Sequence, residues 1–277
     1  MIQKLAILLT CHNRREKTLI CLRSLYNCYL PDNYIFDVFL VDDGSTDGTS
    51  EAVKETYPSV NVISGSGNLY WNRGMFLAWE TAAKASEYDF YLWLNDDTFL
   101  FNTAIQQLIR CSQQTKNKQI IVGATQSALD NAITYSGFLK QKKIVEPSGT
   151  LQHCDYFNGN IVLIPSKVYN LLGNLDNHFQ HALGDFDYGL RAAKKNILSK
   201  VAPLCLGKCE AHLFDPSWRN QSVPLYKRFH HLYSPTGCNP FEIFIYDKRH
   251  NGLLLAIFHF FTIHYLTFFP WIWKREK

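Results

Sequence analysis

The stretch Tyr88–Thr98, which reads YDFYLWLNDDT, decides the fold that this sequence predicts. Its residues Phe90–Leu94 are all aromatic or aliphatic, and so short an apolar run is typical of a strand buried on both faces of a sheet. The run stops at Asn95-Asp96-Asp97. Adjacent carboxylates at the end of a buried strand are costly to leave unpaired, and the usual remedy is a divalent cation held by hard oxygen ligands. The simpler interpretation is that both acids only cap the helix that follows.

The first half of the chain alternates strand-like and helix-like segments. Apolar runs predict the strands, and apolar residues at helical spacing predict the helices between them. This alternation predicts an α/β fold in which a mostly parallel sheet is flanked by helices. The expected strands are 4–10, 36–41, 60–64, 90–94 and 119–123, and the expected helices lie around 19–26, 49–57, 75–86 and 103–113.

The second half of the chain is less regular. We expect an antiparallel pair from 132–139 and 142–147, and a strand over 156–165 that is interrupted at Asn158-Gly159. The remaining expectations are a helix over 167–172, which Ser166 caps and Gly173 closes, and a strand over 200–206.

Composition narrows the classes of protein that fit. The chain has 277 residues, of which 47% are hydrophobic, enough for the core of one large domain with additions. The net charge of +4 is well short of a nucleic-acid-binding signature, so we expect no nucleic-acid partner. A mildly basic chain suits anionic ligands or an anionic membrane surface.

Eight cysteines are scattered along the chain, most of them in apolar segments, as is typical of buried free thiols. Cys205 and Cys209, followed by His212, form a weak zinc pattern because no second pair accompanies them. The apolar run at the N-terminus is too short for a signal peptide and has no cleavage pattern. We therefore expect a reduced, cytoplasmic setting.

Polar residues follow three of the expected strands. They are Thr10–Arg14 after the first strand, Asp42-Asp43 after the second and Asn95–Asp97 after the fourth. Because the carboxyl ends of parallel strands meet at one edge of a sheet, we expect these residues to lie together. A nucleotide would span that edge, with Asp43 accepting hydrogen bonds from the base or ribose and Arg14 meeting phosphate oxygens.

Five motifs in a fixed order resemble a known family. They are LLTCHNR (8–14), VDDGSTDGT (41–49), GNLYWNRGM (67–75), LWLNDDT (92–98) and GDFDYGLR (184–191). This set is similar to the inverting family-2 glycosyltransferases with the GT-A fold, and among them to the bacterial members described as rhamnosyltransferase-like. The resemblance covers roughly residues 3–215 and implies a Rossmann-like, mostly parallel sheet flanked by helices.

For the donor site, the resemblance implies a nucleotide pocket at the ends of the strands. Asp43 would contact the base, Asp42 would support the turn around it, and Asp96 would face the ribose or the sugar. The loop beneath the donor would contribute the side-chain amide of Asn72 and the guanidinium of Arg73. The donor-binding residues implied in this way are Thr10, His12, Arg14, Asp42, Asp43, Asn72, Arg73 and Asp96.

The resemblance also implies a metal ion and a general base. Asn95-Asp96-Asp97 takes the place of the DxD motif with Asn95 replacing the first acid, and Asp97 would bind Mn²⁺ or Mg²⁺. His212 matches a position that sometimes supplies another metal ligand. Asp185 matches the general base, which takes the proton of the acceptor hydroxyl. The alternative for Asp185 is that it only caps its helix.

The reaction implied is the transfer of a sugar from a UDP- or dTDP-sugar to a hydroxyl of a saccharide or lipid-linked saccharide acceptor, in cell-surface polysaccharide synthesis. A single displacement inverts the anomeric carbon, whereas a retaining double displacement asks for a second carboxylate as nucleophile. Two alternatives stay open. One is a nucleotidyltransferase, which would want a glycine-rich loop after the first strand. The other is a non-catalytic, membrane-associated scaffold that binds carbohydrate or nucleotide.

The segment 251–273 carries no charged residue and is rich in aromatic side chains. Its length would just span a bilayer, but its histidines, threonines and Pro270 make it a poor spanning helix. Basic residues on both sides favour a segment that lies on an anionic surface, at the inner face of the cell membrane. The alternative is docking on the protein's own core or in a dimer interface, and the oligomeric state stays open.

These expectations divide the chain at residue 215. Residues 1–215 would form the GT-A domain, with a nucleotide-binding half over 1–125 and an acceptor half over 126–215. Residues 216–277 would form a helical, aromatic-rich extension that associates with a membrane.

Overall fold

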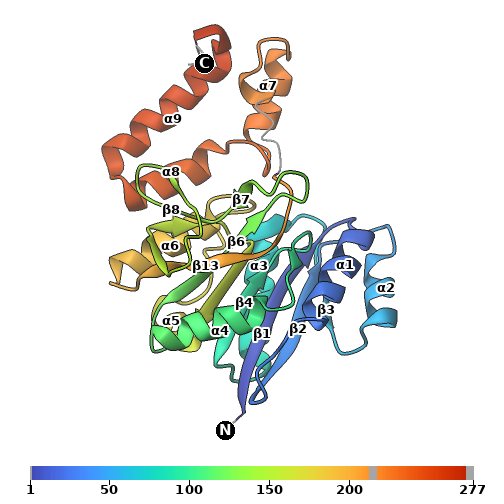
Figure 1. Ribbon diagram of the computed structural model, residues 1–277. Helices are drawn as coiled ribbons and strands as arrows, with labels where there is room; N and C mark the ends of the chain where they lie inside the picture. Colours follow the sequence, from blue (N-terminus) through green and yellow to red (C-terminus); the bar gives the residue numbers. More distant parts are fainter. Residues whose placement is uncertain (1, 212–216, 273–277) are drawn as a thin grey trace. The chain divides into compact units, whose positions relative to one another are not determined.

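The computed structural model describes residues 2–211 and 217–272, and its contacts divide the chain into two units (Figure 1). The first unit contains the residues up to 177 together with 184–211. The second contains the short segment 178–183 and the residues after 211. The boundary predicted at residue 215 falls outside the described residues and stays a prediction.

The first unit is built on a sheet of ten strands, counted over the described residues. Eight of them form one path, in the order β10 (Gln152–Cys154), β13 (Ser199–Lys208), β6 (Ile120–Gln126), β12 (Ile161–Pro165), β4 (Phe90–Leu94), β1 (Gln3–Cys11), β2 (Tyr34–Asp42) and β3 (Asn61–Ser64). Strands β4, β1, β2 and β3 run parallel, and so do β13 and β6. Two strands of this path are antiparallel to their neighbours. Strand β12 is antiparallel to β4 and β6, and β10 is antiparallel to β13. The prediction of an α/β fold with a mostly parallel sheet is confirmed.

Helices cover both faces of this sheet (Figure 1). One face carries α1 (Arg15–Tyr26), α2 (Thr49–Thr56) and α4 (Ala104–Gln114), and the other carries α3 (Tyr70–Ala85), α5 (Ser166–Leu172) and α6 (Gly184–Lys194). Strand β1 serves both cores, because Leu5 and Ile7 join the first cluster while Ala6 and Leu8 join the second. This division follows from the alternation of side chains along a strand.

The irregular second half forms short strands. Strands β8 (Gly137–Phe138), β9 (Ile144–Val145) and β11 (Tyr156–Phe157) make a small antiparallel sheet, in which β8 pairs with β9 as the sequence predicts. Strand β7 (Ile133–Tyr135) pairs with β6 instead, and β5 (Phe99–Leu100) pairs with β13. The predicted strand over 156–165 is interrupted at the expected place, since β11 ends at Phe157 and β12 begins at Ile161.

Two helix starts differ from the prediction. Helix α3 begins at Tyr70 rather than at Met75, because the Asp43 carboxylate accepts hydrogen bonds from the Leu69 and Tyr70 amides at the helix start. Ser166 is the first residue of α5 rather than its cap, and the preceding Pro165 occupies the cap position. The α3 contact joins residues far apart in the chain, so local sequence does not reveal it.

The second unit is helical in its described part. It contains a turn of 3₁₀ helix at Ser217–Arg219, α7 (Leu225–Leu232), α8 (Pro240–His250), α9 (Leu253–Phe268) and a further 3₁₀ turn at Pro270–Ile272. The segment predicted to lie on a membrane is therefore mainly α9. Among the described residues, no helix is both long and apolar enough to cross a bilayer.

Candidate active site

The carboxyl ends of β1 and β4 bring a predicted cation and a predicted acidic pair together. Arg14 Nη1 donates to Asp96 Oδ1 at 3.2 Å and to Asp97 Oδ2 at 2.9 Å. Both acids are almost buried, whereas 38% of the Arg14 side chain is exposed. His12 lies at the same edge, with its Nδ1 atom 2.6 Å from the backbone oxygen of Asp43. The expectation that these strand ends share one edge is met by these contacts.

Asp96 sits in an environment unlike that of a surface acid. Burial raises the pKa of its carboxyl to about 7, although the nearby Arg14 guanidinium acts in the opposite direction. The Asp97 carboxylate adds to the rise through like-charge repulsion. The Asp96 Oδ2 atom is buried and has no hydrogen-bond partner among the residues that the structure describes. A buried carboxylate oxygen in this state is suited to a cation or to a hydroxyl donor of a ligand.

The oxygen atoms at this edge fit a divalent cation. Asp96 Oδ2 and the adjacent Asp97 carboxylate are hard ligands, and Mg²⁺ sites are often completed by water and by substrate phosphates. Within residues 2–211 and 217–272, no three His, Cys, Asp or Glu side chains gather into a metal site made by protein alone. The second predicted ligand, His212, lies outside the described residues. Water and the phosphate oxygens of a ligand would be suitable further ligands for a cation held by these carboxylates.

Cys209 is a neighbour of the acidic pair that the sequence pattern associates only with zinc. Its Sγ atom lies 3.6 Å from Asp97 Oδ1 and 3.6 Å from Asn160 Nδ2. Burial, followed by the charge of Asp97, raises the pKa of the thiol to about 12. The thiol is therefore protonated near neutral pH and donates to the Asp97 carboxylate.

Asp42 and Asp43 organise the loops around the end of β2. Asp42 Oδ1 accepts from the Ser45 amide at 2.9 Å, and Oδ2 accepts from the Ser50 hydroxyl. Asp43 Oδ1 accepts from the Gly67 amide at 2.8 Å, while its Oδ2 accepts from two amides at the start of α3. The Asp43 carboxylate thus accepts three backbone hydrogen bonds from the loop that is predicted to lie beneath the donor.

The predicted donor residues at the start of α3 also make contacts within the protein. Asn72 is buried and donates through Nδ2 to the Asp176 backbone oxygen at 2.8 Å. Arg73 Nε donates to the Asn177 backbone oxygen at 3.1 Å. Thr10 is packed so closely against Gly74 that a Cβ atom added to this glycine would lie 2.2 Å from the Thr10 hydroxyl oxygen. The first turn of α3 is therefore fixed to β1 on one side and to residues 176–177 on the other.

Asp185 stands in the first turn of α6. Its Oδ2 atom accepts from the Gly159 amide at 2.9 Å, and its Oδ1 atom accepts from the Phe186 amide at 2.8 Å. Burial raises the pKa of this carboxyl to about 6, and the backbone hydrogen bonds limit the rise. A carboxylate with a pKa near 6 is ionised at neutral pH and is a better proton acceptor than an ordinary Asp.

The neighbouring acid Asp187 has a different environment. It is fully buried and pairs with Arg191, whose Nε lies 2.7 Å from Asp187 Oδ2. The same guanidinium donates to the backbone oxygens of Leu172 and Asn174. Asp187 therefore orients Arg191, and Arg191 attaches α6 to the end of α5.

Trp71 and Gly159 connect the acidic pair with Asp185. The Trp71 indole N–H donates to Asn95 Oδ1 at 2.7 Å, next to the acids. A Cβ atom added to Gly159 would lie 2.4 Å from the Trp71 ring and 3.5 Å from Asp185 Cβ. Local sequence does not indicate this contact, because Trp71 and Gly159 lie far apart in the chain and only their approach in space brings them together.

Comparison with protein families gives one match. Residues 6–137, a little under half of the chain, match the family described as "Glycosyl transferase family 2". The matched segment includes β1, β2 and β4 with the acidic pair at its edge, and it stops before Asp185. It confirms the resemblance drawn from the motifs. Among curated proteins, none matches this sequence.

The fold is similar to that of a solved structure, "Crystal structure of S. aureus TarS", with a TM-score of 0.56 and 12% sequence identity. The similarity covers 87% of this chain and 45% of that chain, so this chain spans less than half the length of its relative. At this identity the likeness shows a shared fold alone.

Proposed function

We propose that this chain, which carries a family 2 glycosyltransferase domain over residues 6–137, moves a sugar from a nucleoside-diphosphate sugar to an acceptor hydroxyl with inversion. One observation carries the proposal. Asp185, with its pKa raised to about 6, is linked through Gly159, Trp71 and Asn95 to the acidic pair at the edge of the sheet. The two parts of a transfer site, one for the leaving diphosphate and one for the acceptor proton, are thus connected.

The acidic pair would hold the donor together with a divalent cation. Asp97 and Asp96 would bind Mn²⁺ or Mg²⁺, which when present acts as a Lewis acid that neutralises the charge of the diphosphate. Arg14, which now pairs with both acids, is placed to exchange that contact for a phosphate oxygen. His212 stays a candidate second ligand.

Asp185 would act as the general base. Its carboxylate would accept the proton of the acceptor hydroxyl while that oxygen attacks the anomeric carbon. The nearest acid in sequence, Asp187, is held by Arg191 and is not positioned as a second carboxylate for a double displacement. This environment of Asp187 supports the proposal of a single displacement, and hence of inversion.

The remaining assignments complete the proposal. The donor would be a UDP- or dTDP-sugar, and the acceptor a saccharide or lipid-linked saccharide of a cell-surface polysaccharide. Residues 1–125 would bind the nucleotide, residues 126–215 would bind the acceptor, and 216–277 would be a separate extension. Asp43 would support the donor pocket indirectly, because its carboxylate holds the loop beneath the donor by hydrogen bonds to three backbone amides. Thr10, His12, Asn72 and Arg73 would line or support the donor pocket.

The first test is the binding of nucleoside diphosphates, measured by thermal shift with and without Mn²⁺. A ligand at a hundredfold excess over its Kd stabilises the folded state by about 2.7 kcal/mol, which corresponds to several degrees. We expect one diphosphate to produce this shift in the wild type in a metal-dependent way, and Asp97→Ala to abolish it. Asp32→Ala, at an exposed acid outside the site, is the matched control. If no diphosphate shifts the melting temperature, the donor site is wrong.

A further inference from the structure

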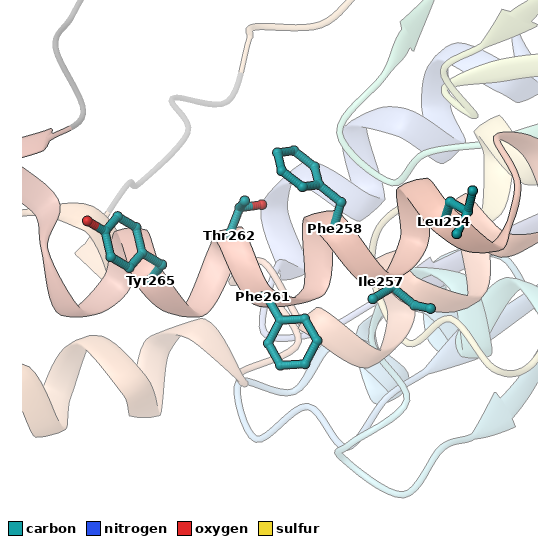
Figure 2. Close-up of a pocket in the computed structure, with 6 residues that line it drawn as sticks. All are labelled: Leu254, Ile257, Phe258, Phe261, Thr262 and Tyr265. Carbon is teal, nitrogen blue, oxygen red and sulfur yellow. The ribbon is translucent and has the colours of Figure 1, made fainter.

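Helix α9 presents a stripe of large apolar side chains that no other described residue of the second unit covers. Leu254 is 85% exposed, Phe258 60% and Phe261 66%. Because these positions recur at intervals of three and four residues, they stand on one side of the helix. A contiguous exposed patch of this kind marks an interaction surface rather than ordinary surface variation. Figure 2 shows these three side chains on successive turns of the helix. Ile257, Thr262 and Tyr265 lie beside them.

The other side of α9 already has its partners within the second unit. Ala256 and Thr267 are fully buried. The Phe260 ring packs against Phe241 and Phe244 of α8, with ring centres 5.7 and 6.1 Å apart. The helix is therefore held in place by one face, and the exposed stripe is not needed to attach it.

The exposed charged side chains that are described in the second unit are basic. Its described residues, 178–183 and 217–272, contain two acids, Glu242 and Asp247, and both are buried. The same residues contain five Lys and Arg side chains, of which Lys227 and Lys248 are exposed. The outward charge of this part of the chain is thus positive. It complements an anionic surface.

The length of α9 sets how it would meet a lipid bilayer. Its 16 residues extend about 24 Å at 1.5 Å per residue, whereas the hydrocarbon core is about 30 Å thick. A helix with one apolar stripe and basic surroundings lies in the plane of the interface with that stripe buried among the acyl chains. Tyr265 and Trp271, both exposed, are side chains that favour the level of the head groups.

We infer that the exposed stripe of α9 is a docking surface for an anionic lipid bilayer, which the net positive charge of this unit would attract. The inference does not depend on sugar transfer, because it uses no residue of the candidate active site. It adds a consequence to that proposal, since an acceptor carried on a lipid would be met at the same surface.

The test is flotation of the full chain with lipid vesicles. Vesicles of phosphatidylcholine with phosphatidylglycerol should bind the wild type at least about tenfold more strongly than phosphatidylcholine alone. The double variant Phe258→Glu, Phe261→Glu should bind the anionic vesicles at least about tenfold more weakly. The control Leu129→Glu, Leu171→Glu changes two exposed apolar residues of the first unit and should bind like the wild type. Raising NaCl from about 0.1 M to about 0.5 M should weaken binding.

Two results would overturn the inference. One is equal vesicle binding by the wild type and by the Phe258/Phe261 double variant. The other is a wild type that ignores vesicles but sediments as a dimer that the double variant dissociates, because a second copy would then cover the stripe. Thermal shift with nucleoside diphosphates, run on the same variants, should be unchanged. That measurement separates a failure of this surface from a failure of the donor site.

Discussion

At the scale of single residues, two acids with raised pKa values have different surroundings. Asp185 is held by two backbone amides, and burial brings its pKa to about 6. The pKa of Asp96 is raised further, to about 7, despite its contact with Arg14, and within the described part of the chain its Oδ2 atom has no hydrogen-bond partner. The first residue is ready to accept a proton at neutral pH, whereas the second gains most from a bound cation.

The ionisation of Asp185 predicts the lower limb of the pH–rate profile. Because the base must be deprotonated, kcat/KM for the acceptor at saturating donor should fall about tenfold for each pH unit below about 6. Asp185→Asn should lower the transfer rate by roughly 10²–10⁴-fold and leave diphosphate binding unchanged. Initial rates and thermal shifts on both proteins provide the measurement. A variant that retains the wild-type rate would rule Asp185 out as the base.

The raised pKa of Asp96 predicts a pH-dependent cost in stability. Between the unfolded value of about 4 and the folded value of about 7, the folded state binds more protons than the unfolded chain. Stability without ligand should therefore fall as pH rises through this range. Asp96→Asn should remove that contribution and stabilise the protein above pH 7 by on the order of 2–4 kcal/mol.

Urea unfolding of the apo protein at several pH values measures the effect of Asp96→Asn. The exposed Asp32→Asn is the control, and it should leave the pH dependence as in the wild type. An Asp96→Asn protein with the same pH dependence as the wild type would contradict the assignment of the slope to this carboxyl.

The residue types of the site were predictable from the sequence, but their partners were not. Acids at the ends of buried strands identified Asp42, Asp43 and the pair at 96–97 as residues that meet at one edge. The contact of Arg14 with that pair crosses more than eighty positions of sequence, and so no local pattern indicates it. The contact of Cys209 with Asp97 was not predicted either, because Cys209 follows β13 and lies 112 positions after Asp97 in the chain.

At the scale of elements, the strands were predicted more reliably than the helix ends. A buried strand is recorded in consecutive apolar residues such as Phe90–Leu94, whereas a helix start depends on what satisfies its free amides. For α3 that partner is Asp43, in a different element. The helix therefore extends to Tyr70, although the residues before Met75 have no helical apolar pattern.

The close approach of β11–β12 to α3 gives a prediction at Gly159. Gly159→Ala would place a Cβ atom 2.4 Å from the Trp71 ring, so the indole must move away from Asn95. We expect a loss of about 1–3 kcal/mol in stability and a lower transfer rate. Trp71→Phe keeps an aromatic ring at this position but removes the N–H donor. It should lower the stability by only about 1 kcal/mol. Urea unfolding and initial rates measure both, and a Gly159→Ala protein with wild-type values would contradict the contact.

For the molecule as a whole, the first unit and the helical second unit are joined by more than one passage of the chain. The segment 178–183 leaves the first unit after Asn177 and returns at Gly184, directly before Asp185. Sequence patterns gave no sign of this excursion, because no linker composition marks it. They did predict the aromatic, uncharged character of the segment that forms α9, on which the lipid-docking inference rests.

The excursion at 178–183 has a consequence for cutting the chain. Phe179 lies with its ring 6.5 Å from that of Tyr246 and beneath the Arg249 guanidinium, and the Gln180 amide donates to Glu242 at 3.2 Å. A protease that cleaves once after Ala211 would therefore leave the C-terminal fragment bound to the segment before Asp185. The nicked protein should run as two bands under denaturing conditions and as one particle in native buffer, and a truncated chain would expose the buried Phe179 to water.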